Sequence, residues 1–218
     1  LNRKPILIFW ITTVLALASA SGGGAILLGY KESARGAVDS TGGVTPPLPP
    51  SRPPLLAVNA DLASSNDPAS TAAAIKAAGF SWVRQEFRWS EIESQPGAFD
   101  WSVADALVGA SYSQSLPIIA VLLTSPRWTH PPTHSSTAPP DSPDDFARFA
   151  SGFANRYGSQ VDVYQIWDEP NLSSGWGDGN PSAAGYAALL QAGYTAIHAA
   201  DSQATVLAAG LAPTVETG

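Results

Sequence analysis

An alternation of short apolar strands with helices begins at residue 55 and constrains the fold more than any other feature of the sequence. Strand-forming runs that alternate with helical segments are typical of a parallel sheet, either open and doubly wound or closed into a barrel. A dinucleotide-binding sheet is disfavoured because no Gly-rich turn follows the first strand. The expected strands cover 55–58, 80–89, 116–124, 161–167 and 205–209, and the expected helices cover 68–78, 103–112, 144–157 and 182–200.

The N-terminal segment, residues 1–32, has the composition of an export or membrane segment. Residues 5–30 carry no charge and follow Arg3-Lys4. A helix of this length can cross a hydrocarbon core of about 30 Å, and the basic residues before it keep the N-terminus inside. The run Ala18-Ser19-Ala20 also fits the cleavage pattern of a secretory signal. Both alternatives export the rest of the chain.

Residues 33–54 are rich in Pro, Gly, Ser and Thr. A run of this composition cannot bury apolar surface, so we expect a disordered, partly extended linker. A tether has a clear role only when the segment before it stays in the membrane. The linker therefore favours an uncleaved transmembrane helix within residues 1–32. We therefore expect a single-pass protein of the cell membrane with an extracytoplasmic domain over residues 55–218, or alternatively a secreted protein.

The charge balance argues against nucleic acid as a partner. The net charge is −7, and the 11 Lys and Arg residues form no basic cluster beyond Arg3-Lys4. The absence of cysteine excludes disulfides and thiolate metal sites. His130 and His134 are four residues apart, but Pro131-Pro132 prevent the helix that would align them as metal ligands. We expect no metal and no cofactor, and the sequence does not reveal an oligomeric state.

The octapeptide Tyr164-Gln-Ile-Trp-Asp-Glu-Pro-Asn171 points to the chemistry of the chain. Its first residues form strands readily, and Pro170 ends the strand because proline has no N–H to donate. Asp168 and Glu169 therefore lie at the carboxyl end of a buried strand. In barrels of parallel strands the active site lies at this end. The alternative is a strand that ends in an ordinary charged turn.

The strand expected at 80–89 carries charge along one side. Alternation places Trp82, Arg84, Glu86 and Arg88 on the same face. So many charges on one face of a parallel strand are costly unless that face lines a wet cavity. An edge strand with one solvated face is the alternative. Arg84 and Glu86 lie near the end of the strand, so they are the candidates for contact with a ligand.

Two stretches together carry a family resemblance, namely Val83-Arg-Gln-Glu-Phe-Arg-Trp-Ser-Glu-Ile-Glu-Ser-Gln-Pro-Gly-Ala-Phe-Asp-Trp101 and Ile166-Trp-Asp-Glu-Pro-Asn171. They resemble the retaining clan A glycoside hydrolases, which are (β/α)8 barrels related to the family 5 and family 39 enzymes. Ser125-Pro-Arg-Trp128 also fits the loop after the third strand of that family. The resemblance covers roughly residues 55–218 and implies an α/β TIM barrel, of which about five β/α units are present.

The resemblance implies hydrolysis of O-glycosidic bonds in a carbohydrate substrate by a retaining double displacement. That mechanism needs two carboxyl groups about 5–5.5 Å apart. The family pattern makes Glu169 the general acid/base and puts the nucleophile, another Glu, at the end of the seventh strand. Five strands precede Gly218, and Glu216 follows the fifth, so it does not match the nucleophile position. We expect the nucleophile outside this chain.

Asp168 departs from the family pattern, which has Asn at this position. The Asn donates a hydrogen bond to the 2-hydroxyl of the sugar, whereas an ionised Asp can only accept one. The contact then requires the hydroxyl to be the donor. This departure motivates the alternative function, a non-catalytic carbohydrate-binding or cell-surface module on a degenerate barrel.

Four further residues are candidates for substrate binding. Trp128 and Trp176 lie in expected loops, where an indole can stack on a sugar or fold back to cap the core. His130 either reaches the substrate cleft or has only a structural role in its loop. Asn171 follows the catalytic motif, although Asn171-Leu-Ser173 also matches a glycosylation sequon.

Overall fold

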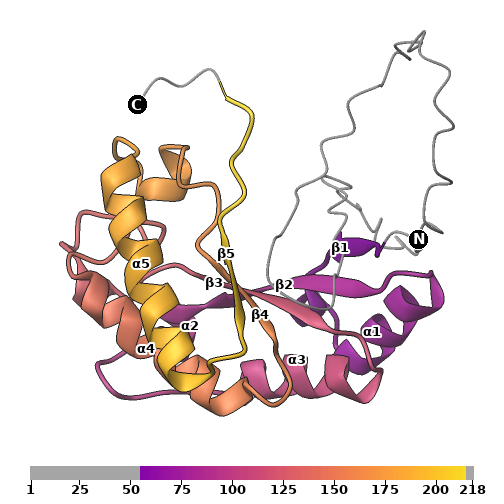
Figure 1. Ribbon diagram of the computed structural model, residues 1–218. Coiled ribbons are helices and arrows are strands. Elements are labelled where there is room, and N and C mark those ends of the chain that lie inside the picture. The colour runs from indigo at the N-terminus through magenta and orange to yellow at the C-terminus, as the bar shows by residue number, and fades with distance from the viewer. Residues whose placement is uncertain (1–54, 215–218) are drawn as a thin grey trace, which may run out of the picture.

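The computed structural model describes residues 55–214, which form one parallel sheet of five strands covered by helices (Figure 1). The strands follow one another in the order β1-β2-β3-β4-β5, so each βα unit adds its strand beside the previous one. A doubly wound sheet reverses its strand order at a switch point, whereas a barrel does not. The sheet is therefore wound like part of a barrel. Its strands are β1 (Ala57–Asn59), β2 (Trp82–Arg88), β3 (Ile118–Leu123), β4 (Val163–Ile166) and β5 (Thr205–Ala208).

The helices expected from the sequence are present with ends that differ by no more than about two residues, the usual uncertainty of helix ends. A short additional helix, α2, begins at Trp89, where the second strand was expected to end. No helix within residues 55–214 is both long enough and apolar enough to span a membrane. The transmembrane helix and linker expected over residues 1–54 lie outside the described residues. The helices are α1 (Pro68–Ala77), α2 (Trp89–Ile92), α3 (Ser102–Ser113), α4 (Pro143–Tyr157) and α5 (Ala183–Ala200).

The two faces of β2 differ in burial as the alternation predicts. Val83, Gln85 and Phe87 are buried, whereas Arg84 and Glu86 between them are partly exposed. Val83 and Phe87 belong to the core that the helices cover. The register pairs Arg84 with Ile119 and Glu86 with Val121, so these side chains share the other, inner face of the sheet. The charged side of β2 therefore lies on the face that would line a barrel.

A cluster of aromatic rings joins the end of β2 to α4. Phe146, Phe149 and Phe153 recur at helical spacing on α4 and are fully buried. Trp89 stacks on Phe149 with 5.4 Å between ring centroids, and Phe87 meets Phe153 edge-on at 4.9 Å. Burial of each such side chain contributes about 1.5–3 kcal/mol, so these rings stabilise the packing of the end of β2 against α4.

The loop from Glu93 to Trp101 is held by a buried carboxyl group. Glu93 is fully buried, and its side chain accepts hydrogen bonds of 2.7 Å from the Trp89 indole and 2.7 Å from the Gly97 N–H. Gly97 has a φ of 77°, which favours glycine. The Glu93 carbonyl also accepts the Trp128 indole N–H at 3.1 Å. Much of the motif that resembles glycoside hydrolases therefore shapes this loop.

Helix α5 approaches the sheet closely at Gly193. A Cβ at this position would lie 3.0 Å from Cδ1 of Ile166 and 3.0 Å from Cε1 of Phe146. Gly193 is buried, and both neighbours belong to the packed core. By contrast, a Cβ at Gly152 of α4 would have no neighbour within 4 Å. Gly193 thus limits how closely α5 packs on the sheet, whereas Gly152 has no such role in α4.

The same substitution at the two helical glycines is expected to have opposite effects. Gly193→Ala should lower the free energy of unfolding by about 1–3 kcal/mol because the core must move to accept the methyl group. Gly152→Ala should raise it by roughly 0.5–1 kcal/mol because alanine favours the helix. Urea unfolding curves of both variants test this. Equal shifts in the same direction would show that close packing at Gly193 is not limiting.

Replacement of Glu93 should destabilise the fold without any direct effect on chemistry. Glu93→Ala leaves the buried Trp89 indole N–H and the Gly97 N–H without their partner, and a cost of about 2–4 kcal/mol is expected. Glu91→Ala is the matched control, because the Glu91 side chain is 73% exposed and has only a 4.0 Å contact with Arg88. The control should change stability by no more than about 0.5 kcal/mol. Thermal unfolding of the two variants measures the difference, and equal melting temperatures would contradict the role of Glu93.

Candidate functional site

The carboxyl ends of β3 and β4 contain left-handed backbone at residues that rarely adopt it. Thr124 has a φ of 64°, Trp167 of 66° and Glu169 of 44°. Such values are costly for residues with a Cβ, and above all for a β-branched threonine. Strained backbone of this kind often occurs at functional sites. The edge where the sequence places Asp168 and Glu169 is therefore unusual in its backbone as well.

The conformation of Trp167 reverses the alternation of β4. Regular alternation would place Trp167 on the inner face with Gln165 and point Asp168 toward the helices. Instead, the Trp167 indole is almost fully buried in the core and meets Phe146 edge-on at 6.1 Å. Its N–H donates to the Gly175 carbonyl at 2.9 Å. The reversal frees Asp168 to turn to the inner face.

Asp168 and Arg84 form an ion pair on that face. Arg84 Nη2 lies 2.5 Å from Asp168 Oδ1, and Arg84 Nε donates to Gln165 Oε1 at 3.0 Å. Gln165 Nε2 donates to Asp168 Oδ1 at 3.2 Å and to the Trp167 carbonyl at 2.7 Å. The sequence predicted Arg84 and Asp168 as site residues, and the structure brings them together. Gln165 completes the network, and its inner-face position in β4 could have indicated it.

Glu86 lies on the inner face nearer the end of β2 and forms a second ion pair. Arg88 Nη2 is 2.5 Å from Glu86 Oε2. The side chains of Glu86 and Arg88 are 35% and 45% exposed. Surface pairs of this kind contribute roughly 0–1 kcal/mol, so they can rearrange readily around a ligand. This predicted site residue is therefore partly exposed and paired with Arg88.

Glu169 is exposed, and its backbone is held on two sides. Its N–H donates to the Gly210 carbonyl at 3.2 Å, and its carbonyl accepts the Leu172 N–H at 3.0 Å. Gly175 packs so closely that a Cβ there would lie 2.2 Å from the backbone carbonyl oxygen of Glu169. Within residues 55–214 the Glu169 carboxyl group has no hydrogen bond or ion pair. A fixed backbone thus presents a carboxyl group that is available for chemistry.

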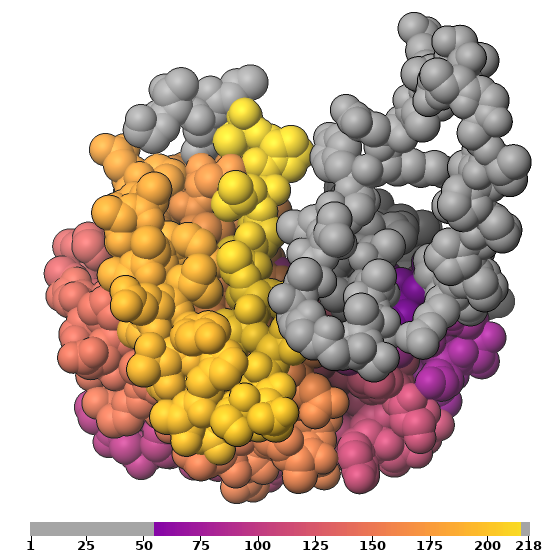
Figure 2. Space-filling view, viewed as in Figure 1, coloured from indigo at the N-terminus to yellow at the C-terminus, as the bar shows by residue number. Residues whose placement is uncertain are grey.

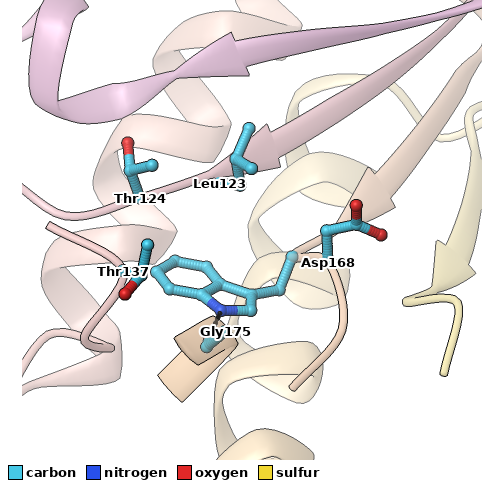
Figure 3. Close-up of a pocket in the computed structure, with 6 residues that line it drawn as sticks. Leu123, Thr124, Thr137, Asp168 and Gly175 are labelled. Atoms are coloured by element: carbon cyan, nitrogen blue, oxygen red, sulfur yellow. Dashed lines mark hydrogen bonds between the residues drawn. The ribbon is translucent and has the colours of Figure 1, made fainter. Parts of the chain in front are cut away.

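A small pocket lies beside this carboxyl edge (Figure 3). Its volume is about 40 Å³, and Thr124 and Thr137 lie on one side of it with Asp168 on the other. This volume suits on the order of one to three water molecules, whereas ligand pockets usually measure about 300–1,000 Å³. The described residues therefore form one wall of a site rather than an enclosed one. The pocket is lined by Leu123, Thr124, Thr137, Trp167, Asp168 and Gly175.

The two candidate stacking tryptophans pack inward. Trp128 is half-buried and meets Trp89 edge-on at 5.8 Å, with the Arg148 guanidinium 5.8 Å from its ring. Trp176 is 8% exposed and meets Trp167 edge-on at 6.2 Å. These contacts fit the alternative in which both indoles cap the core.

His130 and Asn171 have different surroundings. His130 is 6% exposed, and its Nδ1 lies 3.1 Å from the Pro131 carbonyl. Its Nε2 has no partner among the described residues, and its ring lies 6.0 Å from that of His134. Asn171 pairs its side-chain amide with the backbone of Ala212, at 2.8 Å and 3.0 Å. Over residues 55–214, no group of three or more His, Asp or Glu side chains could hold a metal ion.

Tyr186 of α5 is a site-supporting residue that the sequence did not indicate. Its hydroxyl donates to the Ile166 carbonyl at 3.1 Å and accepts the Ala209 N–H at 2.5 Å. Burial raises the pKa of this hydroxyl, so it stays protonated and keeps its donor at neutral pH. The contact joins residues that are 20 and 23 positions apart, so no local sequence pattern signals it.

No family model of protein sequences matches the chain, and no curated protein matches it. Solved structures do match. A β-xylosidase from Caulobacter crescentus CB15 shares 18% identity with a TM-score of 0.59, over 69% of this chain and 34% of that one. The GH39 enzyme from Xanthomonas axonopodis pv. citri shares 21% identity with a TM-score of 0.58 and the same coverage, 69% and 34%. A family 39 glycoside hydrolase from Bacteroides cellulosilyticus WH2 shares 18% identity with a TM-score of 0.57, over 71% and 31%.

These similarities concern the fold. The chain spans about a third of the length of the structures it matches. All three neighbours are glycosidases by name, and the match agrees with the resemblance carried by the two sequence motifs. The chain therefore has the fold of part of a glycosidase barrel, of the kind found in family 39 glycoside hydrolases.

Proposed function

We propose that this chain is part of a retaining glycoside hydrolase that cleaves O-glycosidic bonds in oligo- or polysaccharides. Glu169 is the general acid/base, and the nucleophilic Glu lies outside these residues. The observation that carries the proposal is the exposed, strained Glu169 turn at the carboxyl end of β4, in a partial glycosidase barrel. Active sites of such barrels lie at this end of the strands.

In this mechanism Glu169 transfers one proton in each of two steps. The nucleophile attacks the anomeric carbon and the bond to the leaving oxygen breaks, while the Glu169 carboxyl group gives that oxygen its proton. In the second step the Glu169 carboxylate takes a proton from water, and the oxygen of this water displaces the nucleophile from the sugar. The exposure of Glu169 and its lack of an ion pair within residues 55–214 support this role.

Asp168 is the proposed acceptor for a sugar hydroxyl. Its Oδ1 accepts hydrogen bonds from both Arg84 and Gln165, whereas its Oδ2 has no hydrogen bond among the described residues. An ionised carboxylate can only accept, so the sugar hydroxyl must donate. The Arg84 ion pair balances the charge of Asp168 and keeps this oxygen on the inner face. Glu86, Trp128, His130 and Trp176 remain predictions for substrate contact.

The 218-residue chain is expected to be inactive by itself, because a double displacement needs both carboxyl groups. Release of reducing sugar from a panel of oligosaccharides measures activity. In a chain extended by the strands that complete the barrel, turnover should appear. There, Glu169→Gln should lower kcat/KM by about 10²–10⁴-fold for substrates whose leaving group needs a proton. Glu91→Gln, an exposed change on α2, is the matched control and should leave activity unchanged.

Turnover by the 218-residue chain that disappears in Glu169→Gln would overturn the assignment of the nucleophile. A second candidate function is a non-catalytic carbohydrate-binding module, which the ion-paired Asp168 at the family's Asn position favours. The extended chain separates the two. A binding module would bind oligosaccharides without turnover, and no later strand would end in Glu.

We also propose that residues 1–32 anchor the protein in the cell membrane, with residues 33–54 as a tether. Only the sequence supports this, through the uncharged run after Arg3-Lys4. Alkaline extraction of membranes from cells that express the chain should leave it in the membrane pellet. Recovery in the medium, with a new N-terminus after Ala20, would instead support a cleaved signal and a secreted protein.

A further inference from the structure

The ends of β4 and β5 stay connected beyond the last pair of their ladder. We propose that Asn171 and Tyr186 are positioning residues that hold the Glu169 turn against the segment after β5, residues 209–212. This inference rests on the proposed role of Glu169. It also gives Asn171 a different part from that of a sugar ligand. In Figures 1 and 2 the chain after β5 runs past the segment that follows β4 and lies on the surface.

The Asn171 side chain acts as an additional peptide group. Its Nδ2 donates to the Ala212 carbonyl at 2.8 Å, and its Oδ1 accepts the Ala212 N–H at 3.0 Å. The side-chain amide thus both donates to and accepts from the backbone of one residue, Ala212. These two bonds use one of the two N–H donors and one lone pair of the oxygen, and they hold the side chain against Ala212. Asn171 follows Glu169 by two positions, so this pairing fixes the chain just after the proton donor.

Tyr186 provides the second connection. Ile166 and Ala208 form the last pair of the parallel ladder between β4 and β5. Just beyond this pair, the Tyr186 hydroxyl donates to the Ile166 carbonyl at 3.1 Å and accepts the Ala209 N–H at 2.5 Å. One hydroxyl therefore bridges the strands where they begin to separate. This bridge brings the segment after β5 to the place where Glu169 and Asn171 can bond to it.

The Glu169 turn needs such support because its backbone is strained. Its φ of 44° is unfavourable for a residue with a Cβ and persists only where the surroundings hold it. The Glu169 N–H bonds to the Gly210 carbonyl at 3.2 Å, within the same segment that Asn171 and Tyr186 hold. Without them, the turn can relax and move the carboxyl group. A displacement of about 1 Å can lower the rate of an enzyme by roughly 10²-fold.

Amide hydrogen exchange of the full chain, followed by NMR, tests the proposal without any turnover. In Asn171→Ala and in Tyr186→Phe, the Glu169 amide should exchange at least about tenfold faster, whereas amides in β3 keep their rates. The Glu169 amide is the informative probe, because neither substituted side chain bonds to it. Asn155→Ala on α4 and Tyr194→Phe on α5 are matched controls at exposed positions and should leave the Glu169 amide unchanged.

An unchanged Glu169 amide in both variants would overturn the proposal, whether or not the chain proves to be a glycosidase. If Asn171→Ala does not fold, Asn171→Asp keeps the size of the side chain, replaces the donor to Ala212 with an acceptor and adds a negative charge. In an active extended chain, loss of positioning should lower kcat by about tenfold or more with KM unchanged. A higher KM with unchanged kcat would instead identify Asn171 as a sugar ligand.

Discussion

The left-handed backbone of Trp167 is the constraint on which the candidate site depends. It ends the alternation of β4 and buries the indole beside Phe146. It also turns Asp168 to the inner face, where Arg84 and Gln165 donate hydrogen bonds to its carboxylate. The buried indole stabilises the unfavourable φ through packing and through its bond to Gly175. Core packing therefore sets the site geometry at this strand end. A change that loosens the core would also move the carboxylates.

The sequence predicts much of the fold because strands and helices alternate with clear boundaries. It leaves the winding open, since periodicity does not reveal the order of strands in a sheet, and the ladder order settles this in favour of a barrel-like arrangement. Alternation along β2 correctly places Arg84 and Glu86 on the inner face. Alternation along β4 fails at Trp167, because a backbone reversal is invisible to a period of two. Contacts such as Asn171 with Ala212, 41 residues apart, follow only from the folded chain.

The motif that resembles glycoside hydrolases contains residues of two kinds. Trp89, Glu93 and Trp101 build the loop after β2 and its contact with α4, whereas Arg84 and Glu86 face the open side of the sheet. A sequence match in this region therefore reports first on how the barrel is constructed. The strand ends are the part of the chain suited to chemistry, because carboxyl groups and strained backbone occur there together.

The support of the Glu169 turn by the segment after β5 bears on how such a barrel can be divided. Four βα units would include Glu169 and the whole Arg84 network, but they would lack Gly210 and Ala212, to which the turn is bonded. A boundary placed after the fourth unit would thus separate Glu169 from the residues that hold its turn. As a module that could be exchanged or recombined, the smallest piece that preserves this geometry extends past Ala212.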